Sequence, residues 1–306
     1  MYVRKEAVLS SQIEGTQSTL QDLLSAEARL FGQALPKDVD EVVNYGAAMN
    51  HGLSRLAELP VSARLIREIH AELMRGVRGG RLQPGELRTS QNWIGPSGST
   101  LATASFIPPP HHAVPEALGE LERFMHAKDD LPPLVRIALA HVQFETIHPF
   151  LDGNGRVGRL LITFLLTECG VLLKPVLYLS HYFKRHRQAY YDHLQSVRER
   201  GTWEDWLAFF LKGVIEVAAE ASETARKILA LREAHRSAIT DSLGRSAGYG
   251  HRVLESLFDR PLVSVADVRK LTGTTYAAAN NLVAKFVEIG VLTEMTGHGA
   301  NLVTGD

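Results

Sequence analysis

The feature that most restricts the fold of this chain is the run at residues 148–159, His-Pro-Phe-Leu-Asp-Gly-Asn-Gly-Arg-Val-Gly-Arg. A helical pattern stops at His148-Pro149, because proline lacks an amide hydrogen and clashes with the preceding turn. Helical spacing resumes at Asn154 and continues to residue 168. The chain is therefore expected to leave one helix, cross a short glycine-rich loop and enter the N-terminus of the next helix.

The start of this second helix suits an anion. Gly153 and Gly155 give the backbone the freedom to turn its amides inward as a nest, and the helix dipole adds positive potential. Arg156 and Arg159 are three residues apart, so they share a helix face and can reach one anion with guanidinium forks. The segment predicts a phosphate site.

Two further side chains add chemistry to this site. Asp152 stands just before the nest, where its carboxylate could hold Mg²⁺ against bound phosphates. His148 carries an imidazole, the side chain best suited to take a proton near neutral pH. A lone histidine or an arginine pair is usually structural, but a base, a metal ligand and a phosphate cradle in one short run predict phosphate-centred chemistry.

At residues 148–159 the chain resembles the Fic family, whose pattern His-x-Phe-x-(Asp/Glu)-Gly-Asn-Gly-Arg-x-x-Arg is matched at every fixed position. The resemblance extends over residues 4–231 through Arg88-Thr-Ser-Gln-Asn-Trp93, Pro108-Pro-Pro110 and Tyr190-Tyr191. It implies a mainly α fold, a Fic-type helical bundle with a short β-hairpin flap.

The resemblance also implies an activity, the transfer of AMP from ATP to a Ser, Thr or Tyr hydroxyl of a target protein. His148 would be the general base, Asp152 would hold Mg²⁺, and Phe150 would anchor the loop in the core. Related Doc-type kinases carry lysine where this chain has Gly155, which favours AMP transfer over phosphate transfer. For Tyr191, a core position is an equal alternative to the ATP site. The implied ATP-binding residues are Gly153, Asn154, Gly155, Arg156, Val157, Gly158, Arg159 and Tyr191.

Residues 10–15, Ser-Ser-Gln-Ile-Glu-Gly, resemble the inhibitory motif of the family, (Ser/Thr)-x-x-x-Glu-(Gly/Asn). Ser10 and Glu14 are four residues apart and therefore lie on one helix face. The resemblance implies that Glu14 pairs with Arg159 and occupies the place of the ATP γ-phosphate, so that the enzyme is autoinhibited.

The partners implied by the resemblance are ATP and a target protein. The loop from Leu101 to Ile107 resembles the flap of the family, which aligns the target backbone by strand addition. We also expect a homodimer, and self-modification stays open.

The rest of the chain predicts a helical core and a small C-terminal domain. We expect domains at residues 1–32, with the inhibitory helix, at 33–232, the catalytic core, and at 233–306. Ser18 and Gln21 predict a capping box that opens a helix, and Ser62 predicts an N-cap. Predicted helices cover residues 6–31 in two pieces, 38–58, 62–75, 115–127, 133–146, 154–168, 182–199 and 202–232, with a loop at 76–115 rich in Gly, Pro, Ser and Thr.

The final domain predicts a winged helix-turn-helix, with helices at 263–273 and 274–289 followed by a strand-like segment. This motivates an alternative function, a nucleotide-sensing transcriptional regulator. Its second helix contains one basic residue, Lys285, where DNA-binding helices usually carry several. DNA binding is therefore weakly supported.

A metallohydrolase is a further alternative, because His141, Glu145 and His148 follow spacings of four and three. Pro149 places His148 at a helix end, so it need not share the face of the other two. His141 and Glu145 then fit a polar helix edge.

The composition indicates where in the cell the protein is expected to be located. The net charge of −1 provides no overall attraction to nucleic acid or to an anionic membrane. No apolar run approaches the roughly 20 residues that span a bilayer. The single cysteine, Cys169, cannot form an internal disulfide, which favours the cytoplasm, and its apolar surroundings in sequence predict a buried thiol. No signal peptide is evident, and the abrupt helical start leaves an earlier natural N-terminus open.

Overall fold

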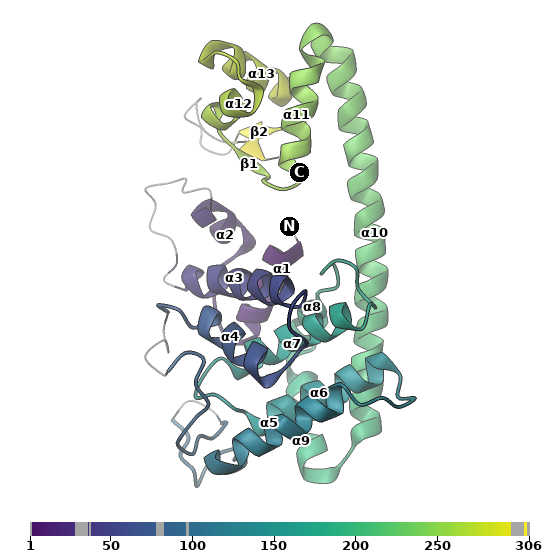
Figure 1. Ribbon diagram of the computed structural model, residues 1–306. Coiled ribbons are helices and arrows are strands. Elements are labelled where there is room, and N and C mark those ends of the chain that lie inside the picture. The colour runs from purple at the N-terminus through teal and green to yellow at the C-terminus, as the bar shows by residue number, and fades with distance from the viewer. Residues whose placement is uncertain are drawn as a thin grey trace. The chain divides into compact units, whose positions relative to one another are not determined.

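The computed structural model describes residues 2–27, 36, 38–77, 83–95, 98–294 and 303–304. Across these residues the chain is mainly helical (Figure 1). It divides into two compact units. We call them the N-terminal unit, Tyr2–Leu23 with Gln33–Ala219, and the C-terminal unit, which is mainly Glu220–Asp306.

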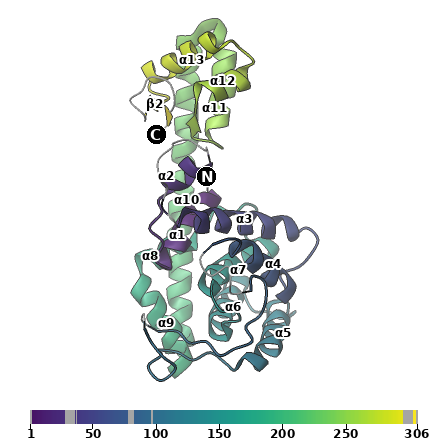
Figure 2. The ribbon, with the colours of Figure 1, turned by 90° about the vertical axis from the view of Figure 1, so that its left-hand side faces the viewer.

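The N-terminal unit is built around α7, Asn154–Glu168, which contacts α1, α3, α4 and α6 (Figures 1 and 2). Nearly every residue of α7 from Asn154 to Leu166 is buried, polar residues of its first turns included, because four other helices pack against it. The elements of this unit are α1 (Tyr2–Ile13), α3 (Val39–Arg55), α4 (Ala63–Leu73), η1 (His111–Ala113), α5 (Val114–Met125), α6 (Pro133–Ile147), α7, α8 (Leu179–Arg185) and α9 (Arg187–Arg200), while α2 (Leu20–Glu27) and α10 (Trp203–Leu243) continue across the boundary between units.

Two glycines allow neighbouring helices to approach α7 closely. A β-carbon at Gly52 of α3 would lie 2.3 Å from the ring of Phe164. A β-carbon at Gly158 of α7 would lie 2.3 Å from Oε1 of Glu145 on α6. Real β-carbons essentially never make contacts this short, so a side chain at Gly52 would force the Phe164 ring to shift, and one at Gly158 would displace the Glu145 carboxylate.

Of the two predicted helix caps, one is confirmed and one is wrong. Ser62 caps α4, because its Oγ accepts a hydrogen bond of 3.3 Å from the amide of Leu65. The second helix begins at Leu20, and its capping box is formed by Thr19 and Asp22 instead of Ser18 and Gln21. The Ser18 hydroxyl donates to Asp38, 20 residues away.

Several boundaries differ from the prediction. The helix expected at 182–199 is two helices, α8 and α9, which meet at His186. No Gly or Pro lies at this junction, so the sequence did not indicate the break. Helix α10 continues to Leu243 instead of ending near residue 232. Cys169 is exposed, because α7 ends at Glu168 and the thiol follows the last turn.

The predicted flap contains one isolated antiparallel bridge, between Ile94 and Phe106, among the residues that the structure describes. A β-hairpin of regular strands is therefore not confirmed. Trp93, Leu101 and Ile107 of this loop are 40%, 45% and 48% exposed.

The C-terminal unit has its own hydrophobic core, with Ile239, Val268 and Phe286 fully buried. Its short strands form an antiparallel sheet in the order β1-β3-β2. A capping box of Ser264 and Asp267 opens α12. The elements are η2 (Gly244–Ser246), α11 (Ala247–Leu257), β1 (Leu262–Val263), α12 (Val265–Thr272), α13 (Tyr276–Glu288), β2 (Thr293–Glu294) and β3 (Val303–Thr304). Helix α11 was not predicted, and residues 296–302, expected to form the wing, lie outside the described residues.

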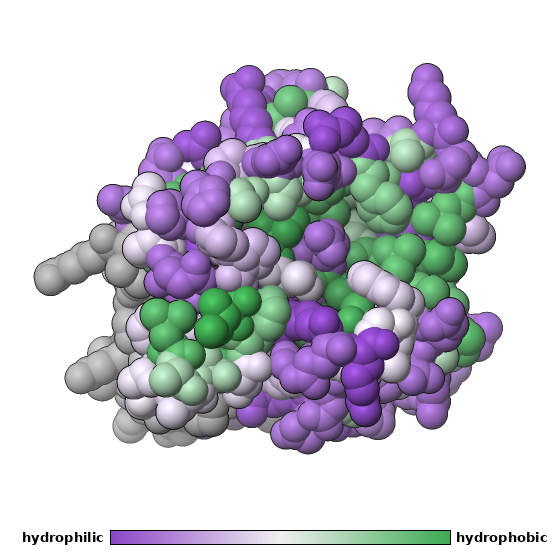
Figure 3. Space-filling view, turned by 90° about the horizontal axis from the view of Figure 1, so that it is seen from below, coloured by the Kyte–Doolittle hydropathy of each residue, from purple (hydrophilic) through white to green (hydrophobic). Residues whose placement is uncertain are grey.

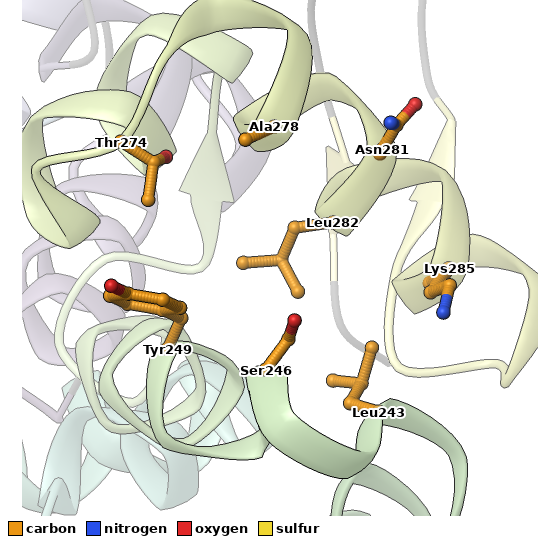
Figure 4. A pocket seen from close by; sticks show the side chains of 8 residues that line it. All are labelled: Leu243, Ser246, Tyr249, Thr274, Ala278, Asn281, Leu282 and Lys285. Carbon is orange, nitrogen blue, oxygen red and sulfur yellow. The ribbon is translucent and has the colours of Figure 1, made fainter.

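A cavity of about 310 Å³ lies within this unit, between one face of α13 and the segment from Leu243 to Tyr249 (Figure 4). Leu282 occupies its centre, Tyr249 lies at one end and Lys285 at the other. The lining is thus partly apolar, with one cation.

The surface of the molecule seen from below carries hydrophobic side chains in more than one patch, set between hydrophilic ones (Figure 3). None of the helices, as far as the chain is described, is long and apolar enough to cross a membrane.

Candidate active site

His148 ends α6 in a left-handed conformation, with φ of 49°. Its amide donates to the carbonyl of Phe144 (2.9 Å), and its own carbonyl accepts from Nε of Arg88 (2.9 Å). A non-glycine residue in this region is strained and persists only where its surroundings hold it. The helix end therefore presents the imidazole in one defined direction.

The imidazole of His148 is neutral at physiological pH. Its pKa is lowered to about 3, mainly by burial and also by the nearby cations Arg198 and Arg88, against the smaller opposing effects of the Glu14 charge and the Glu145 carbonyl. Its Nδ1 is buried and makes no hydrogen bond to any described residue. A neutral imidazole can accept a proton, which is the property required of a general base.

Arg88 holds the loop after His148 in place, a role that the sequence did not reveal. The side chain is 2% exposed. Its guanidinium donates to the carbonyls of His148, Ser90, Pro109 and Ile147. An isolated arginine in a loop has no periodic signal, so its four backbone partners could only be found in the folded chain.

Phe150 anchors the loop, as predicted, since it is fully buried and stacks on His70 at 3.8 Å. The amide of Gly85 donates to Nδ1 of His70, so Nε2 carries the hydrogen and donates to the Asp152 carbonyl at 3.1 Å. Asn154 closes the loop with two bonds to Phe150, accepting from its amide (2.9 Å) and donating to its carbonyl (2.8 Å). These two bonds hold the Asn154 side chain against the backbone of the loop.

Arg156 and Arg159 do not converge on one partner. Arg156 forms an ion pair with Glu41 of α3 at 3.1 Å and lies 4.0 Å from Asp152. Arg159 forms an ion pair with Glu14 at 2.6 Å. Within the described part of the chain, Nε of Arg156 and NH1 of Arg159 are buried without a hydrogen-bond partner, which leaves two N–H donors for an anion.

Glu14 lies directly over the start of α7. A β-carbon at Gly155 would fall 2.4 Å from its Oε1 and 3.2 Å from NH1 of Arg159. Burial raises the pKa of Glu14, but Arg159 outweighs this and holds the pKa below its usual value. The glutamate is thus an anion that occupies the predicted phosphate cradle.

Helix α1 and the turn after it bring Glu14 to this place through several contacts. Ser10 accepts from Nε of Arg159 with its hydroxyl (2.8 Å) and from NH2 with its carbonyl (3.0 Å). Glu6 is buried, and it accepts hydrogen bonds from Ser180 and Tyr45. Burial raises the pKa of Glu6 to about 7, so this carboxyl is largely protonated in a mildly acidic medium.

Tyr190 and Tyr191 have different surroundings. Tyr190 is 1% exposed, and its hydroxyl bonds to Nε2 of His141 at 2.8 Å. Tyr191 is 37% exposed, with Arg187 over its ring. Burial raises the pKa of Tyr191 to about 12, and the charge of Glu14 adds to this, which indicates that Tyr191 faces the side of the site that holds Glu14.

The structure does not support the metallohydrolase alternative, because the nitrogen atoms of His141 that would bind the metal are engaged in other bonds. Nδ1 of His141 is bonded to the Gly158 carbonyl (3.0 Å) and Nε2 to Tyr190, so neither nitrogen is free for a metal. His141 and Glu145 are 0% and 5% exposed, so the expectation of a polar helix edge is wrong. Periodicity could not reveal this, because buried polar residues follow the same spacing as exposed ones. Burial raises the pKa of Glu145 to about 7.

Val157 and Gly158 belong to the packing of α7. The amide of Val157 donates to the Gly153 carbonyl and its side chain lies in the core. Gly158 abuts Glu145. The structure therefore gives both residues a packing role, and their expected contact to ATP stays a prediction.

Asp152 fits a magnesium ion held jointly with phosphates. Its side chain is 46% exposed beside the nest, and Oδ1 accepts from the amide of Gly153 at 2.6 Å. No group of three His, Cys, Asp or Glu side chains arranged for a metal occurs in the portion of the chain described. Magnesium bound with a nucleotide needs only one or two protein carboxylates, because phosphates and water complete its shell.

Two family models match this chain. The model of the Fic/DOC family matches residues 60–166, and that of the Fic/DOC family N-terminal region matches residues 1–54. Together they cover just over half of the sequence, including both His148–Arg159 and Glu14. The chain belongs to the Fic/DOC family.

Its curated relatives carry names that refer to AMP transfer. The protein adenylyltransferase Fic of Aedes aegypti is 29% identical over 194 residues, which are 61% of this chain and 35% of that protein. A probable protein adenylyltransferase of Aquifex aeolicus is 39% identical over 69 residues, 22% of each chain. The chain thus spans about a third of the length of the animal relative.

Among solved structures, a Fic family protein of Desulfovibrio desulfuricans superposes with a TM-score of 0.64 at 20% identity. The match covers 98% of this chain and 87% of that one. This likeness shows a shared fold.

Proposed function

We propose that this protein transfers AMP from ATP to a hydroxyl side chain of a target protein. The observation that carries the proposal is the neutral, partly buried imidazole of His148, which precedes the cradle at the start of α7. The names of the curated relatives support the same chemistry.

In the proposed reaction, His148 takes the proton from a Ser, Thr or Tyr hydroxyl as its oxygen attacks the α-phosphorus of ATP. The new bond joins this oxygen to AMP, and the bond to the β-phosphate oxygen breaks as pyrophosphate leaves. The first amides of α7 and the unpartnered N–H groups of Arg156 and Arg159 would bind the phosphates. Asp152 would hold Mg²⁺, whose charge offsets that of the phosphates.

We further propose that Glu14 inhibits this reaction. Its carboxylate lies over Gly155 and uses NH2 of Arg159, so it competes with a phosphate for the same place and the same cation. Removal of Glu14 would leave Arg159 supported by Ser10 and ready for the nucleotide.

The decisive experiment incubates the purified Glu14→Gly variant with ATP and Mg²⁺ and follows AMP incorporation by intact mass and by labelled ATP. His148→Ala in the same background should reduce transfer by roughly 10²–10⁴-fold while ATP binding persists. The matched control is His112→Ala, since His112 is an exposed histidine outside the site. Transfer by His148→Ala at the rate of the control would overturn the assignment.

For the C-terminal unit we propose a winged helix. The support is the element order α11-β1-α12-α13-β2-β3 with sheet order β1-β3-β2, in which α12 and α13 form the helix-turn-helix. DNA recognition is the alternative function. A filter-binding titration with duplex DNA at two salt concentrations would support it if affinity fell steeply with salt and Lys285→Ala reduced the slope by about one.

Four expectations stay predictions. A target docking along Leu101 to Ile107 agrees with the exposure of these residues. No contact among the described residues tests whether the protein forms a homodimer, modifies itself or is located in the cytoplasm.

A further inference from the structure

Arg198 of α9 contacts both the flap loop and the helix end that carries His148. Its guanidinium carbon lies 4.1 Å from the centroid of the Phe106 ring. Its NH2 donates to the Glu145 carbonyl at 2.9 Å, and Nε lies 3.4 Å from the Thr146 hydroxyl. One side chain thus joins two segments 40 residues apart in sequence, residues 106 and 146.

Phe106 is the flap residue best placed to transmit such a contact. Its amide donates to the Ile94 carbonyl (3.0 Å) and its carbonyl accepts from the Ile94 amide (2.9 Å), so it forms the bridge of the flap. Gln195, three residues before Arg198 on the same face of α9, donates to the carbonyl of Ser105 at 2.9 Å. Helix α9 therefore contacts two consecutive flap residues, Ser105 and Phe106.

The carbonyl that Arg198 holds belongs to the last turn of α6. Glu145 lies three residues before His148, whose amide ends the same turn by donating to the Phe144 carbonyl at 2.9 Å. An arginine that fixes this carbonyl therefore holds the last turn of α6, from which the His148 side chain extends. An aliphatic side chain at position 198 could occupy the same volume. It could not, as arginine does, donate to a carbonyl and stack on an aromatic ring at the same time.

We propose that Arg198 is a positioning residue that sets the distance between the target-presenting strand at Phe106 and the base His148. This inference rests on the proposed transferase function and adds a residue to it. Arg198 touches neither ATP nor the hydroxyl. It acts through Phe106 on the target strand and through the Glu145 carbonyl on the base.

The first test needs no target. Amide hydrogen exchange in the full chain is measured at Ile94 and Phe106, whose amides make the two bonds of the bridge. Arg198→Met and Phe106→Leu should each reduce protection about fivefold, the effect of losing a partly buried cation–π contact of ~1 kcal/mol. The double variant should lose little more than either single one, because both remove the same contact. Unchanged protection, or additive losses, would overturn the proposal.

The second test uses the Glu14→Gly background, labelled ATP and a pool of synthetic decapeptides that each contain one Ser, Thr or Tyr. Arg198→Met should raise the peptide KM and lower kcat while the KM for ATP stays constant. Arg198→Lys can still donate to the Glu145 carbonyl but has no planar group for Phe106, so it should recover kcat and keep the raised peptide KM. Equal changes in both KM values would show a general packing role and overturn the proposal.

The matched control is Arg200→Met on the same helix, where Arg200 bonds to Ser196 away from the flap. It should leave exchange at Ile94 and both KM values unchanged. If Glu14→Gly transfers no AMP to any acceptor, the proposed function fails, and the exchange measurement still decides whether Arg198 couples the two segments.

Discussion

The two sides of the first turns of α7 carry similar ion pairs in different surroundings. On one side, Arg156 meets Glu41, whose side chain is 11% exposed within α3. On the other, Arg159 meets Glu14, whose side chain is 36% exposed after the end of α1. Both arginine side chains are buried, at 5% and 1% exposure.

The difference lies in what remains when the carboxylate leaves. Without Glu41, the partners left to Arg156 among the described residues would be Met74 and, at 4.0 Å, Asp152. Without Glu14, Arg159 would keep two hydrogen bonds to Ser10. The same kind of pair can therefore support the fold on one side and act as a removable block on the other.

The largest expected effect is the difference in the free energy of unfolding between a variant that lacks Glu41 and one that lacks Glu14. Glu41→Ala leaves a buried guanidinium without its partner, so we expect a loss of about 3–5 kcal/mol in the free energy of unfolding. Glu14→Ala should cost about 1 kcal/mol or less, because its carboxylate is partly exposed and Ser10 remains. Urea unfolding of both variants measures the contrast, and equal losses would remove the distinction between the two sides.

The second prediction uses pH, which should act mainly on the Arg159 side. Burial raises the pKa of Glu6 to about 7, so the folded state favours its protonated form. The stabilisation is complete below the unfolded pKa near 4.5 and is lost as pH rises through about 7, which amounts to about 3 kcal/mol. α1 should therefore be held less firmly in mildly alkaline solution.

Glu6→Gln should reduce this dependence by about 3 kcal/mol, and Glu116→Gln, an exposed control on α5, should leave it unchanged. Glu145, whose pKa burial also raises to about 7, contributes its own share in both variants. The measurement is the free energy of unfolding at pH 5 and pH 8, with hydrogen exchange in α1 as a local readout. If wild type and Glu6→Gln lose the same stability between these values, the buried carboxyl of Glu6 is not the responsible group.

The smallest effect tests the contact between Glu14 and the cradle. Gly155→Ala should destabilise the wild type by about 1 kcal/mol or less, because its β-carbon would lie 2.4 Å from Oε1 of Glu14 and the flexible carboxylate must move aside and weaken its pair with Arg159. In Glu14→Gly the same change should be neutral or stabilising, since alanine is the better helix former. A double-mutant cycle with no coupling would place Glu14 away from Gly155 in solution.

Much of the site could be predicted from sequence because its residues are contiguous. The run from His148 to Arg159 identified the loop, and the predicted helix at 154–168 has the bounds of α7. The Glu14–Arg159 ion pair expected from the resemblance is present in the structure. Local spacing was sufficient in these cases.

The rest depended on contacts between distant segments. Arg88, Glu41 and Arg198 carry no local pattern, and each acquires its role only from partners on other elements. Asn154, expected at the nucleotide, is used to close the loop onto Phe150. The prediction of a buried Cys169 was wrong. The apolar run before it suggested burial up to the cysteine, but the buried residues of α7 end at Leu166.

The central claim, that Glu14 restrains an AMP transferase by occupying the cradle of Arg159, is tested most directly by transfer from labelled ATP. Wild type, Glu14→Gly and the double variant Glu14→Gly, Arg159→Ala are compared at one ATP concentration with Mg²⁺. We expect Glu14→Gly to exceed wild type by tenfold or more, since each ~1.4 kcal/mol of bias removed raises the competent fraction about tenfold. The double variant should lose that gain. Equal rates for wild type and Glu14→Gly would contradict the account.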